Sequence, residues 1–421
     1  MATTTASVSE ICAEAKRASR RLAMLGSNVK NAALEAIAAA LIERTPEILE
    51  ANARDLEAGR ESGLSSALLD RLALDERRVE DIAAGARKIA SLPDPVGEVI
   101  DGFRLPNGLD VRKVRVPLGV VAVVYEARPN VTIDAAALCL KSGNAIVLRG
   151  SSMAAHSNGV LAGVASAAAI EAGLPPGSMS LVGGGGRDEL AELATQAGIV
   201  DLIIPRGGEG LKAALKGVAT VPVIYAASGN CHVYIDASAD LDDALAIALN
   251  AKLQRPGVCN AAETLLVHAD VAGAFLPEAL RALSDAGVRL HGDERARAVA
   301  GNVAIEAATD EDWNTEYLAL ELAVAVVDST DEAIAHINRH GSGHSEAILT
   351  RDTRSARAFQ LGVDAACVYV NASTRFTDGG EFGMGAEIGN STQKLHARGP
   401  IGLRELCTFK YLVEGAGHVR P

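Results

Sequence analysis

The chain has 421 residues, 48% of them hydrophobic, and this length and composition predict two or three domains with ample cores. A formal net charge of -13 and an aromatic content of 3% argue against a general nucleic-acid surface, although a local basic cluster could still bind an anionic substrate. The N-terminus, MATTTASVSEICAEAKRASRR, has no apolar stretch before its basic residues, and no segment offers about 18 uninterrupted apolar residues. We therefore expect a soluble, cytoplasmic protein with neither a membrane nor a nucleic-acid partner.

The cysteines and histidines predict neither a disulfide framework nor a metal site. No CxxC pair and no regular spacing connects the six cysteines, which are Cys12, Cys139, Cys231, Cys259, Cys367 and Cys407. His336, His340 and His344 are spaced by four and would share one face of a helix, but Gly341 and Gly343 interrupt that helix. We expect no bound metal.

The first part of the chain predicts a helical scaffold followed by an arm. Apolar residues recur at helical spacing from about 8 to 52 and from 68 to 92, where prolines end the pattern. In residues 102–119, two runs with the side-chain alternation typical of strands flank a Pro-Asn-Gly turn, which predicts a β-hairpin. Because a two-stranded arm is marginal alone, we expect it to pair with another element, such as a second subunit.

Between residues 120 and 225 short apolar strands alternate with helical patterns, which predicts βαβ units and a parallel sheet in an α/β fold. The expected strands are 120–125, 145–148, 179–182, 202–204 and 221–225, and the expected helices are 152–172, 187–197 and 209–218. Open parallel sheets bind ligands outside the carboxyl ends of their strands. The loops 149–152, 183–186 and 206–210 are therefore predicted to form the binding edge.

These loops predict a nucleotide site without the usual dinucleotide fingerprint. In VGGGGRDEL, Asp188 stands where the third glycine of GxGxxG belongs, whereas Gly207 and Gly208 form part of another glycine loop on the same edge. Arg149, Ser151 and Ser152 lie where a ribose-binding acid would sit in an NAD enzyme, and such a cluster suits the 2′-phosphate of NADP. The alternative is an arginine on a solvated loop.

The stretch KLQRPGVCNAAETLLVH, residues 252–268, predicts a cysteine held in a turn before a strand. Pro256 and Gly257 end the preceding helix and swing Cys259 into a loop. A thiol there can act as a nucleophile, with backbone N–H groups of the bend directed at an oxyanion, and Arg255 could lower its pKa. The alternative is a small buried apolar cysteine.

In EARPNVTIDAAALCLKSGNAIVLRGS, Asn130 lies just before a helix. It can cap that helix, in competition with Thr132, or its amide can donate to an oxyanion, and the sequence leaves both alternatives open. Near residue 236 the pattern restarts with a helix that leads into the cysteine loop, and further βα units run to about residue 371. The glycine-rich tail that follows predicts a lid over the active site and a terminal strand at 405–413.

Five strings together resemble the gamma-glutamyl phosphate reductases, a family of the aldehyde dehydrogenase superfamily. They are RPGVCNAAETLLVH, EARPNVTIDAAALCLKSGNAIVLRGS, DLIIPRGGEGL, HINRHGSGHSEAI and EFGMGAEIGNSTQKLHARGP, and they occur in the order typical of that family. One departure is Asn390, where relatives are expected to carry an apolar residue. The resemblance implies a Rossmann-like cofactor domain (1–101 and 118–236), an α/β catalytic domain (237–395) and an oligomerisation arm (102–117 and 396–421).

The resemblance also implies the chemistry. Cys259 would attack L-glutamyl 5-phosphate to form a thioester, Asn130 would help hold the oxyanion, and NADPH would reduce the thioester to glutamate 5-semialdehyde in proline synthesis. The glutamate that activates water in hydrolytic relatives is missing from AASGNCHVYID, so hydrolysis is not provided for. A homo-oligomer and functional coupling to glutamate 5-kinase are the expected associations.

A polyanionic substrate needs cations near the thiol, and the candidates are Lys141, Arg255, Arg375 and Lys394. Each could equally be a surface charge. Two other classes stay open at this stage. One is a CoA-dependent acylating or general aldehyde dehydrogenase, and the other is a non-catalytic descendant of the fold.

Overall fold

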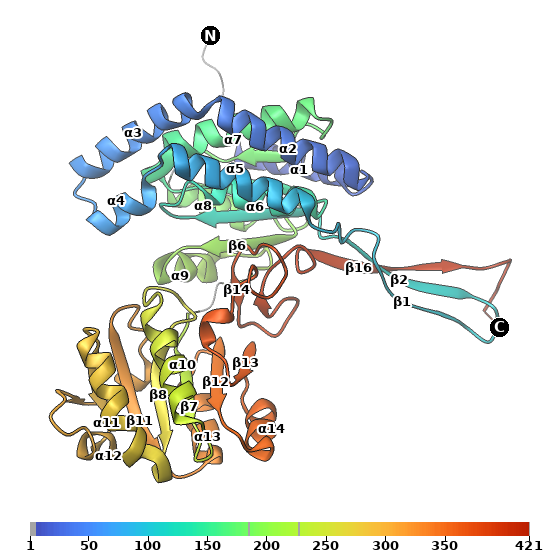
Figure 1. The fold of residues 1–421 in the computed structure, drawn as a ribbon. Coiled ribbons are helices and arrows are strands. Elements are labelled where there is room, and N and C mark those ends of the chain that lie inside the picture. Colours follow the sequence, from blue (N-terminus) through green and yellow to red (C-terminus); the bar gives the residue numbers. More distant parts are fainter. Residues whose placement is uncertain (1–5, 184–185, 226–227, 421) are drawn as a thin grey trace. The chain divides into compact units, whose positions relative to one another are not determined.

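The computed structural model describes residues 6–183, 186–225 and 228–420 and divides into two compact units. Unit 1 comprises Met1–Tyr225, Met384–Gly389 and Ile401–Pro421, and unit 2 comprises Ala226–Gly383 and Asn390–Pro400 (Figure 1). This division precedes the predicted boundary at residue 236 because the strand β7 (Cys231–Ile235) belongs to the sheet of unit 2. The functional roles assigned to the parts stay predictions.

A four-stranded parallel sheet forms the centre of unit 1. Its strand order is β5 (Met179–Leu181), β4 (Ala145–Arg149), β3 (Val120–Tyr125) and β6 (Leu202–Arg206). Every residue of β3 is buried, as expected for an apolar strand with neighbours on both sides. The prediction of a strand at 221–225 was wrong. Only an isolated bridge joins Val223 to Ile203, and Pro222 has no N–H with which to extend the pairing.

Nine helices of the described residues surround that sheet, and their apolar faces supply its core. They are α1 (Val8–Leu22), α2 (Ser27–Glu43), α3 (Thr45–Glu61), α4 (Ser66–Leu72), α5 (Glu76–Ser91), α6 (Val131–Lys141), α7 (Ala155–Glu171), α8 (Arg187–Ala194) and α9 (Glu209–Val218). The stretch Ser152–Glu171 is, among the described residues, long and apolar enough to cross a membrane, but half of it is buried. Since α7 packs against α2 and α3, this stretch has the character of a core helix.

Three antiparallel strands form the arm, in the order β1 (Val99–Arg104), β2 (Asp110–Pro117) and β16 (Cys407–Glu414). The turn closes with a hydrogen bond from the Gly108 N–H to the Leu105 carbonyl, and Gly108 takes a φ of 97°, which favours glycine. The predicted hairpin and the predicted terminal strand are both confirmed. They pair with each other, which gives the marginal hairpin a third strand.

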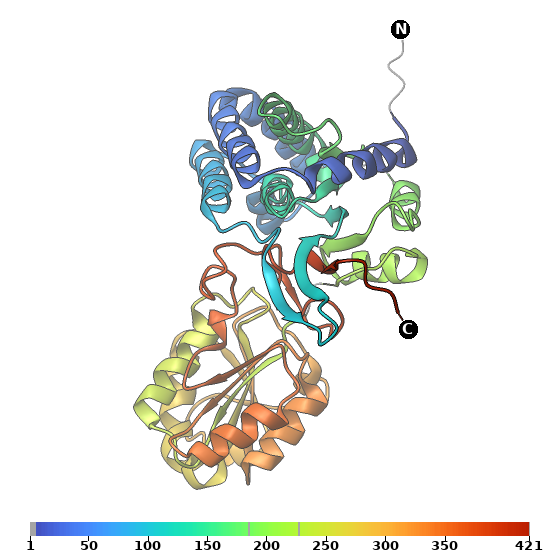
Figure 2. The same cartoon turned by 90° about the vertical axis from the view of Figure 1, so that its right-hand side faces the viewer.

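Unit 2 contains a seven-stranded parallel sheet. The strand order is β10 (Glu306–Ala307), β9 (Arg289–Gly292), β11 (Glu321–Val327), β8 (Ala262–His268), β7, β12 (Ser345–Leu349) and β13 (Cys367–Val370). One apolar cluster joins the sheet to α10 (Leu241–Leu253), α11 (Ala269–Asp285) and α12 (Glu294–Ala298). A second cluster joins it to α13 (Thr330–His340) and α14 (Thr353–Gly362), so helices cover both faces (Figure 2).

A buried ion pair connects the last turn of α10 to the start of β8. The Lys252 ammonium and the Glu263 carboxylate are both fully buried, and Nζ lies 2.5 Å from Oε2. The other Glu263 oxygen accepts the Leu318 N–H at 3.1 Å. Burial lowers the pKa of Lys252 and raises the pKa of Glu263 to about 7, and the charge of each partner opposes the effect on the other. The pair closes the loop that carries Cys259.

Replacing Lys252 with alanine should leave a buried carboxylate without its partner, and we expect the free energy of unfolding to fall by about 3–5 kcal/mol. Thermal and denaturant unfolding of Lys252→Ala measure this change. The matched control is Arg54→Ala, which breaks the exposed Arg54–Glu50 pair, also 2.5 Å long, and should cost less than about 1 kcal/mol. Equal losses in the two variants would contradict a structural role for the buried pair.

Candidate functional site

The loop between α10 and β8 presents one cysteine to solvent. Residues 256 and 257 form the predicted turn, and Cys259 follows it before β8 begins. Cys259 is half-buried, whereas the other five cysteines are buried. Since a thiol must be accessible to attack a substrate, this exposure separates Cys259 from the other five.

A side chain that was not predicted, that of Asn260, anchors the loop just after the thiol. The Asn260 amide donates to the carbonyls of Arg375, at 3.2 Å, and of Thr377, at 3.0 Å. The Thr374 hydroxyl donates back to the Asn260 carbonyl at 2.7 Å. These bonds tie the cysteine loop to residues 374–377, which lie within the tail segment predicted as a lid. Asn260 directly follows the cysteine, and that position was the only sequence signal for it.

Two of the four predicted cations lie in the electrostatic field of this loop. Arg375 donates from Nε to the Gln254 side chain at 2.8 Å. Burial lowers its pKa first and the charge of Arg255 lowers it further, while Cys259 acts in the opposite direction. Arg255 itself is exposed in the turn before Cys259. Arg255 and Cys259 therefore both act electrostatically on the Arg375 guanidinium.

The other two predicted cations have partners of their own. Lys394 is exposed and pairs with Asp364 at 2.5 Å, and Arg398 shares that carboxylate. Lys141 lies in unit 1 and is buried, with its ammonium donating to Asn31 at 2.5 Å and to the Ala90 carbonyl at 2.6 Å. Burial lowers its pKa. Substrate binding by Lys141 would require these contacts to break.

Asn130 lies in unit 1 at the start of α6, directly after the loop that follows β3. Its side chain does not cap the helix and instead donates from Nδ2 to Asp134 at 2.8 Å. Thr132 does not cap it either, because its hydroxyl is bonded to Tyr125 and Asn158. The structure therefore supports neither predicted cap. The hydrogen bond to Asp134 restrains the orientation of the Asn130 amide.

The carboxylate that holds Asn130 has unusual electrostatics. Burial raises the pKa of Asp134 to about 6, while the Asn130 hydrogen bond and the charge of Arg206 act to lower it. Arg206 ends β6, so the end of a neighbouring strand contributes to the electrostatics around Asn130. Asp134 was not predicted, although its position one helical turn after Asn130 could have revealed it.

The predicted cofactor residues gather at the carboxyl ends of β4 and β6. Arg149 ends β4 and donates to the Gly186 carbonyl at 3.1 Å, and burial lowers its pKa. The Ser151 hydroxyl is buried and has no hydrogen-bond partner among the described residues, while Ser152 is exposed. A buried hydroxyl without a partner among the described residues, two positions after an arginine, fits a phosphate-bearing group. Gly184 and Gly185 of the predicted loop 183–186 lie outside the described residues.

The second glycine pair approaches a carboxylate closely. The Gly208 N–H, at the start of α9, donates to Glu126 at 3.1 Å. A Cβ on Gly207 would lie 2.7 Å from the Glu126 side chain, so a larger residue could not fit without a shift. Glu126 follows β3 and was not predicted. The ends of β3, β4 and β6 thus bring Glu126, Arg149 and the glycines to one edge of the sheet.

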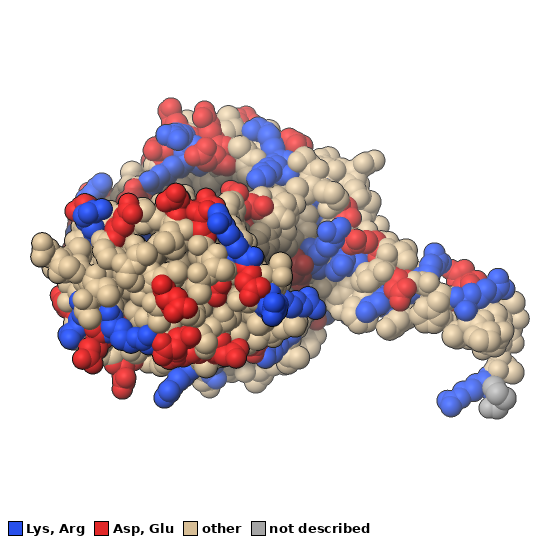
Figure 3. Space-filling model, turned by 60° about the horizontal axis from the view of Figure 1, so that its bottom comes forward, with Lys and Arg blue, Asp and Glu red and all other residues tan. Residues whose placement is uncertain are grey.

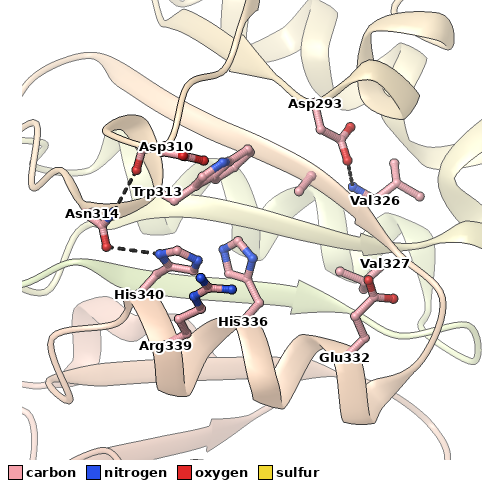
Figure 4. A pocket seen from close by; sticks show the side chains of 11 residues that line it. Asp293, Asp310, Trp313, Asn314, Val326, Val327, Glu332, His336, Arg339 and His340 are labelled. Atoms are coloured by element: carbon pink, nitrogen blue, oxygen red, sulfur yellow. Dashed lines mark hydrogen bonds between the residues drawn. The ribbon is translucent and has the colours of Figure 1, made fainter.

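The three spaced histidines do not share one helical face. His336 and His340 lie on α13, but the helix ends at Gly341, and the Nδ1 of His344 bonds the Ser345 hydroxyl instead. No group of three potential ligands among the described residues could hold a metal ion. His336 and His340 line a cavity of about 560 Å³ with Trp313 and Asp310, and none of the predicted site residues lines it (Figure 4).

Comparisons with known proteins show which family the chain resembles. The model of the aldehyde dehydrogenase family matches residues 1–311 and 310–410. A gamma-glutamyl phosphate reductase from Thermobifida fusca (strain YX) is 56% identical over 413 residues, which is 98% of each chain. One from Moorella thermoacetica is 57% identical and covers 96% of this chain and 97% of its own.

A solved structure extends the likeness to the fold. The crystal structure of gamma-glutamyl phosphate reductase from Thermotoga maritima superimposes with a TM-score of 0.97 at 46% identity, covering 99% of this chain and 100% of its own. Both the sequence and the fold therefore match over nearly the full length. The chain belongs to the aldehyde dehydrogenase family and, within it, to the gamma-glutamyl phosphate reductases.

Proposed function

We propose that the protein reduces L-glutamyl 5-phosphate to L-glutamate 5-semialdehyde with release of phosphate, the second step of L-proline synthesis. The observation that carries the proposal is the half-buried Cys259 in its anchored turn, in a chain whose full-length relatives are named gamma-glutamyl phosphate reductases. A CoA-dependent acylating enzyme would need no phosphate for the reverse reaction, so phosphate dependence separates the two.

Cys259 begins the reaction as a thiolate that attacks the C5 carbonyl, which becomes tetrahedral and carries a negative oxygen. In the reacting enzyme this oxyanion accepts hydrogen bonds from the Asn130 amide and the Cys259 N–H. Phosphate then leaves and a thioester remains. After reduction, the C–S bond breaks, which releases the aldehyde and regenerates the thiolate.

Arg255 and Arg375 are the cations that we assign to the anionic substrate, because both act electrostatically in the neighbourhood of Cys259. Lys394 and Lys141 remain weaker candidates, since their ammonium groups already have partners. The guanidinium groups would neutralise the departing phosphate or bind the α-carboxylate.

The family implies a nicotinamide cofactor, which supplies a hydride when bound. We propose NADP rather than NAD, with Arg149, Ser151 and Ser152 at the 2′-phosphate and Gly207 and Gly208 beside the phosphate chain. The orphaned Ser151 hydroxyl supports this assignment. We further propose a cytoplasmic location and functional coupling to glutamate 5-kinase, which would supply the acyl phosphate.

The arm supports a homo-oligomer. Cross-strand pairing places Phe103, Val111 and Val413 side by side, and alternation puts Tyr411 and Phe409 on the same face. Lys113 lies on this face too, with Nζ 3.7 Å from the centroid of the Phe409 ring. Phe103, Tyr411 and Val413 are each more than half exposed, although they are apolar or aromatic. Figure 3 shows uncharged surface between scattered charges along the arm. A second copy that covers this face would bury it.

Cys259→Ser should lower the rate at least a hundredfold while the affinity for NADPH stays within about twofold, because the hydroxyl is a poor nucleophile and the cofactor loops lie elsewhere. The assay is phosphate-dependent reduction of NADP by glutamate 5-semialdehyde, with fluorescence titration of NADPH. A variant that keeps more than a tenth of the wild-type rate would remove Cys259 from the mechanism. Wild-type turnover without phosphate would refute the phosphorylating reaction.

Asn130→Ala should lower kcat by about 100-fold to 1000-fold and leave KM nearly unchanged, because its amide meets charge that exists only in the tetrahedral state. Steady-state kinetics and a thermal melt of the purified variant measure this. Asp81→Ala, which alters an exposed side chain of α5, is the control and should keep the kcat and melting temperature of the wild type. If turnover stays within about threefold while the melting temperature falls, Asn130 is structural.

Arg149→Ala should reduce the preference for NADPH over NADH, because the guanidinium is assigned to the 2′-phosphate. The ratio of kcat/KM for the two cofactors should fall about tenfold or more, mostly through a higher KM for NADPH. Arg187→Ala, at the exposed start of α8, serves as the control. Unchanged selectivity, or a wild type that prefers NADH, would overturn the assignment.

The double substitution Tyr411→Glu with Val413→Glu should dissociate the oligomer, because it replaces two exposed apolar or aromatic side chains of the arm with carboxylates. Sedimentation velocity should show a smaller species than the wild type. Leu361→Glu, on a side chain of α14 that is 70% exposed, should leave the assembly intact. A monomeric wild type would exclude the proposed interface.

A further inference from the structure

A second cysteine lies directly behind the nucleophile. Cys231 is the first residue of β7 and is fully buried. Its thiol donates to the carbonyl oxygen of Cys259, with Sγ 3.2 Å from that oxygen. The strands β7 and β8 pair in parallel, and their register shifts between Cys231 and His232. The contact therefore joins the start of one strand to the loop that precedes its neighbour.

The backbone just before Cys231 lies against the same carbonyl. A Cβ on Gly229 would lie 1.5 Å from the Cys259 oxygen and 2.3 Å from its carbonyl carbon, so only glycine permits this approach. The Gly229 N–H donates to Glu316 at 2.6 Å. Asn230 donates from its amide to the carbonyls of Trp313, at 2.8 Å, and of His340, at 2.9 Å. Residues 229–231 thus form a fixed support.

We propose that Cys231 is a positioning residue for the reaction, whose thiol holds the Cys259 carbonyl against Gly229 and thereby sets the direction of the nucleophilic side chain. The inference rests on the proposed role of Cys259 as nucleophile. Rotation about the Cα–C bond of Cys259 is restrained at two places, by Cys231 at its own carbonyl and by the Asn260 anchors one residue later.

The chemistry of the buried thiol suits this task. Burial, with added repulsion from Glu346 and Cys259, raises the pKa of Cys231 well above its usual value, so the group stays an S–H donor at neutral pH. A thiol that stays protonated does not compete with Cys259 as a nucleophile. Without the donor, the carbonyl loses a buried partner and the thiol of Cys259 gains freedom, and a displacement of about 1 Å costs on the order of a hundredfold in rate.

The test compares Cys231→Ala, Cys231→Ser and Cys12→Ala in the phosphate-dependent assay. Cys12 is also fully buried, in α1 of unit 1, and its replacement removes the same side-chain volume from a core. We expect Cys231→Ala to lower kcat about tenfold to a hundredfold, with KM for substrate and NADP within twofold. Cys231→Ser keeps a donor and should recover kcat to within about threefold of wild type. Cys12→Ala should leave kcat unchanged.

Alkylation of Cys259 by iodoacetamide gives a second readout that does not require turnover. Its rate constant should fall in Cys231→Ala in step with kcat and recover in Cys231→Ser, with labelling assigned by peptide mapping. If Cys231→Ala keeps kcat and the alkylation rate within twofold, the positioning role is refuted. An equal fall in Cys12→Ala, or no recovery in Cys231→Ser, would likewise overturn it.

The two proposals fail in distinguishable ways. If Cys259→Ser is inactive and Cys231→Ala is fully active, Cys259 remains the nucleophile and only the positioning role is lost. If Cys259→Ser retains activity, the proposed mechanism itself is wrong. Where Cys231→Ala does not fold, Cys231→Ser supplies the measurement. If the serine variant melts like the wild type but has lost turnover, a hydrogen-bond donor at position 231 does not suffice to position Cys259, and the proposal is refuted.

Discussion

The Lys252–Glu263 ion pair is the constraint on which the geometry of the cysteine loop depends. It joins the end of α10 to the start of β8, so the intervening residues begin and end at fixed points. A buried pair of this kind contributes little net stability compared with apolar side chains, but losing one partner is costly. Its value here is specificity, because it fixes the two ends from which Cys259 projects. Asn260, Thr374 and Cys231 then restrain the loop between them.

Local patterns were enough to predict most of the elements. The wholly apolar run of β3 predicts a buried strand, and the glycine-containing turn of the arm predicts a hairpin. Both occur as expected. The strand predicted at 221–225 failed because apolar composition does not show that Pro222 interrupts the pairing. The residue pattern of β2 or β16 alone does not indicate that the two strands pair, and only the family resemblance placed both segments in one arm.

Residue chemistry was harder to predict than residue location. The sequence shows that a lysine carries a charge but not which group pairs with it. Lys141 and Lys394 were therefore predicted as substrate cations on the same grounds as Arg255 and Arg375, and only the structure shows their own partners. The same holds for Asn130, whose amide is oriented by Asp134 rather than by the helix terminus. The anchors Asn260 and Glu126 were missed because their roles depend on segments distant in sequence.

The pairing of β2 with β16 also sets an order of events during synthesis. Val116 pairs with Thr408, so β2 leaves the ribosome about 290 residues before its partner, and at about 5–20 residues per second it waits on the order of tens of seconds. Throughout that interval the hairpin has an open edge on its β2 side and an unfinished apolar face. A nascent chain in this state is open to pairing with other nascent chains, and only completion of the C-terminus removes the hazard.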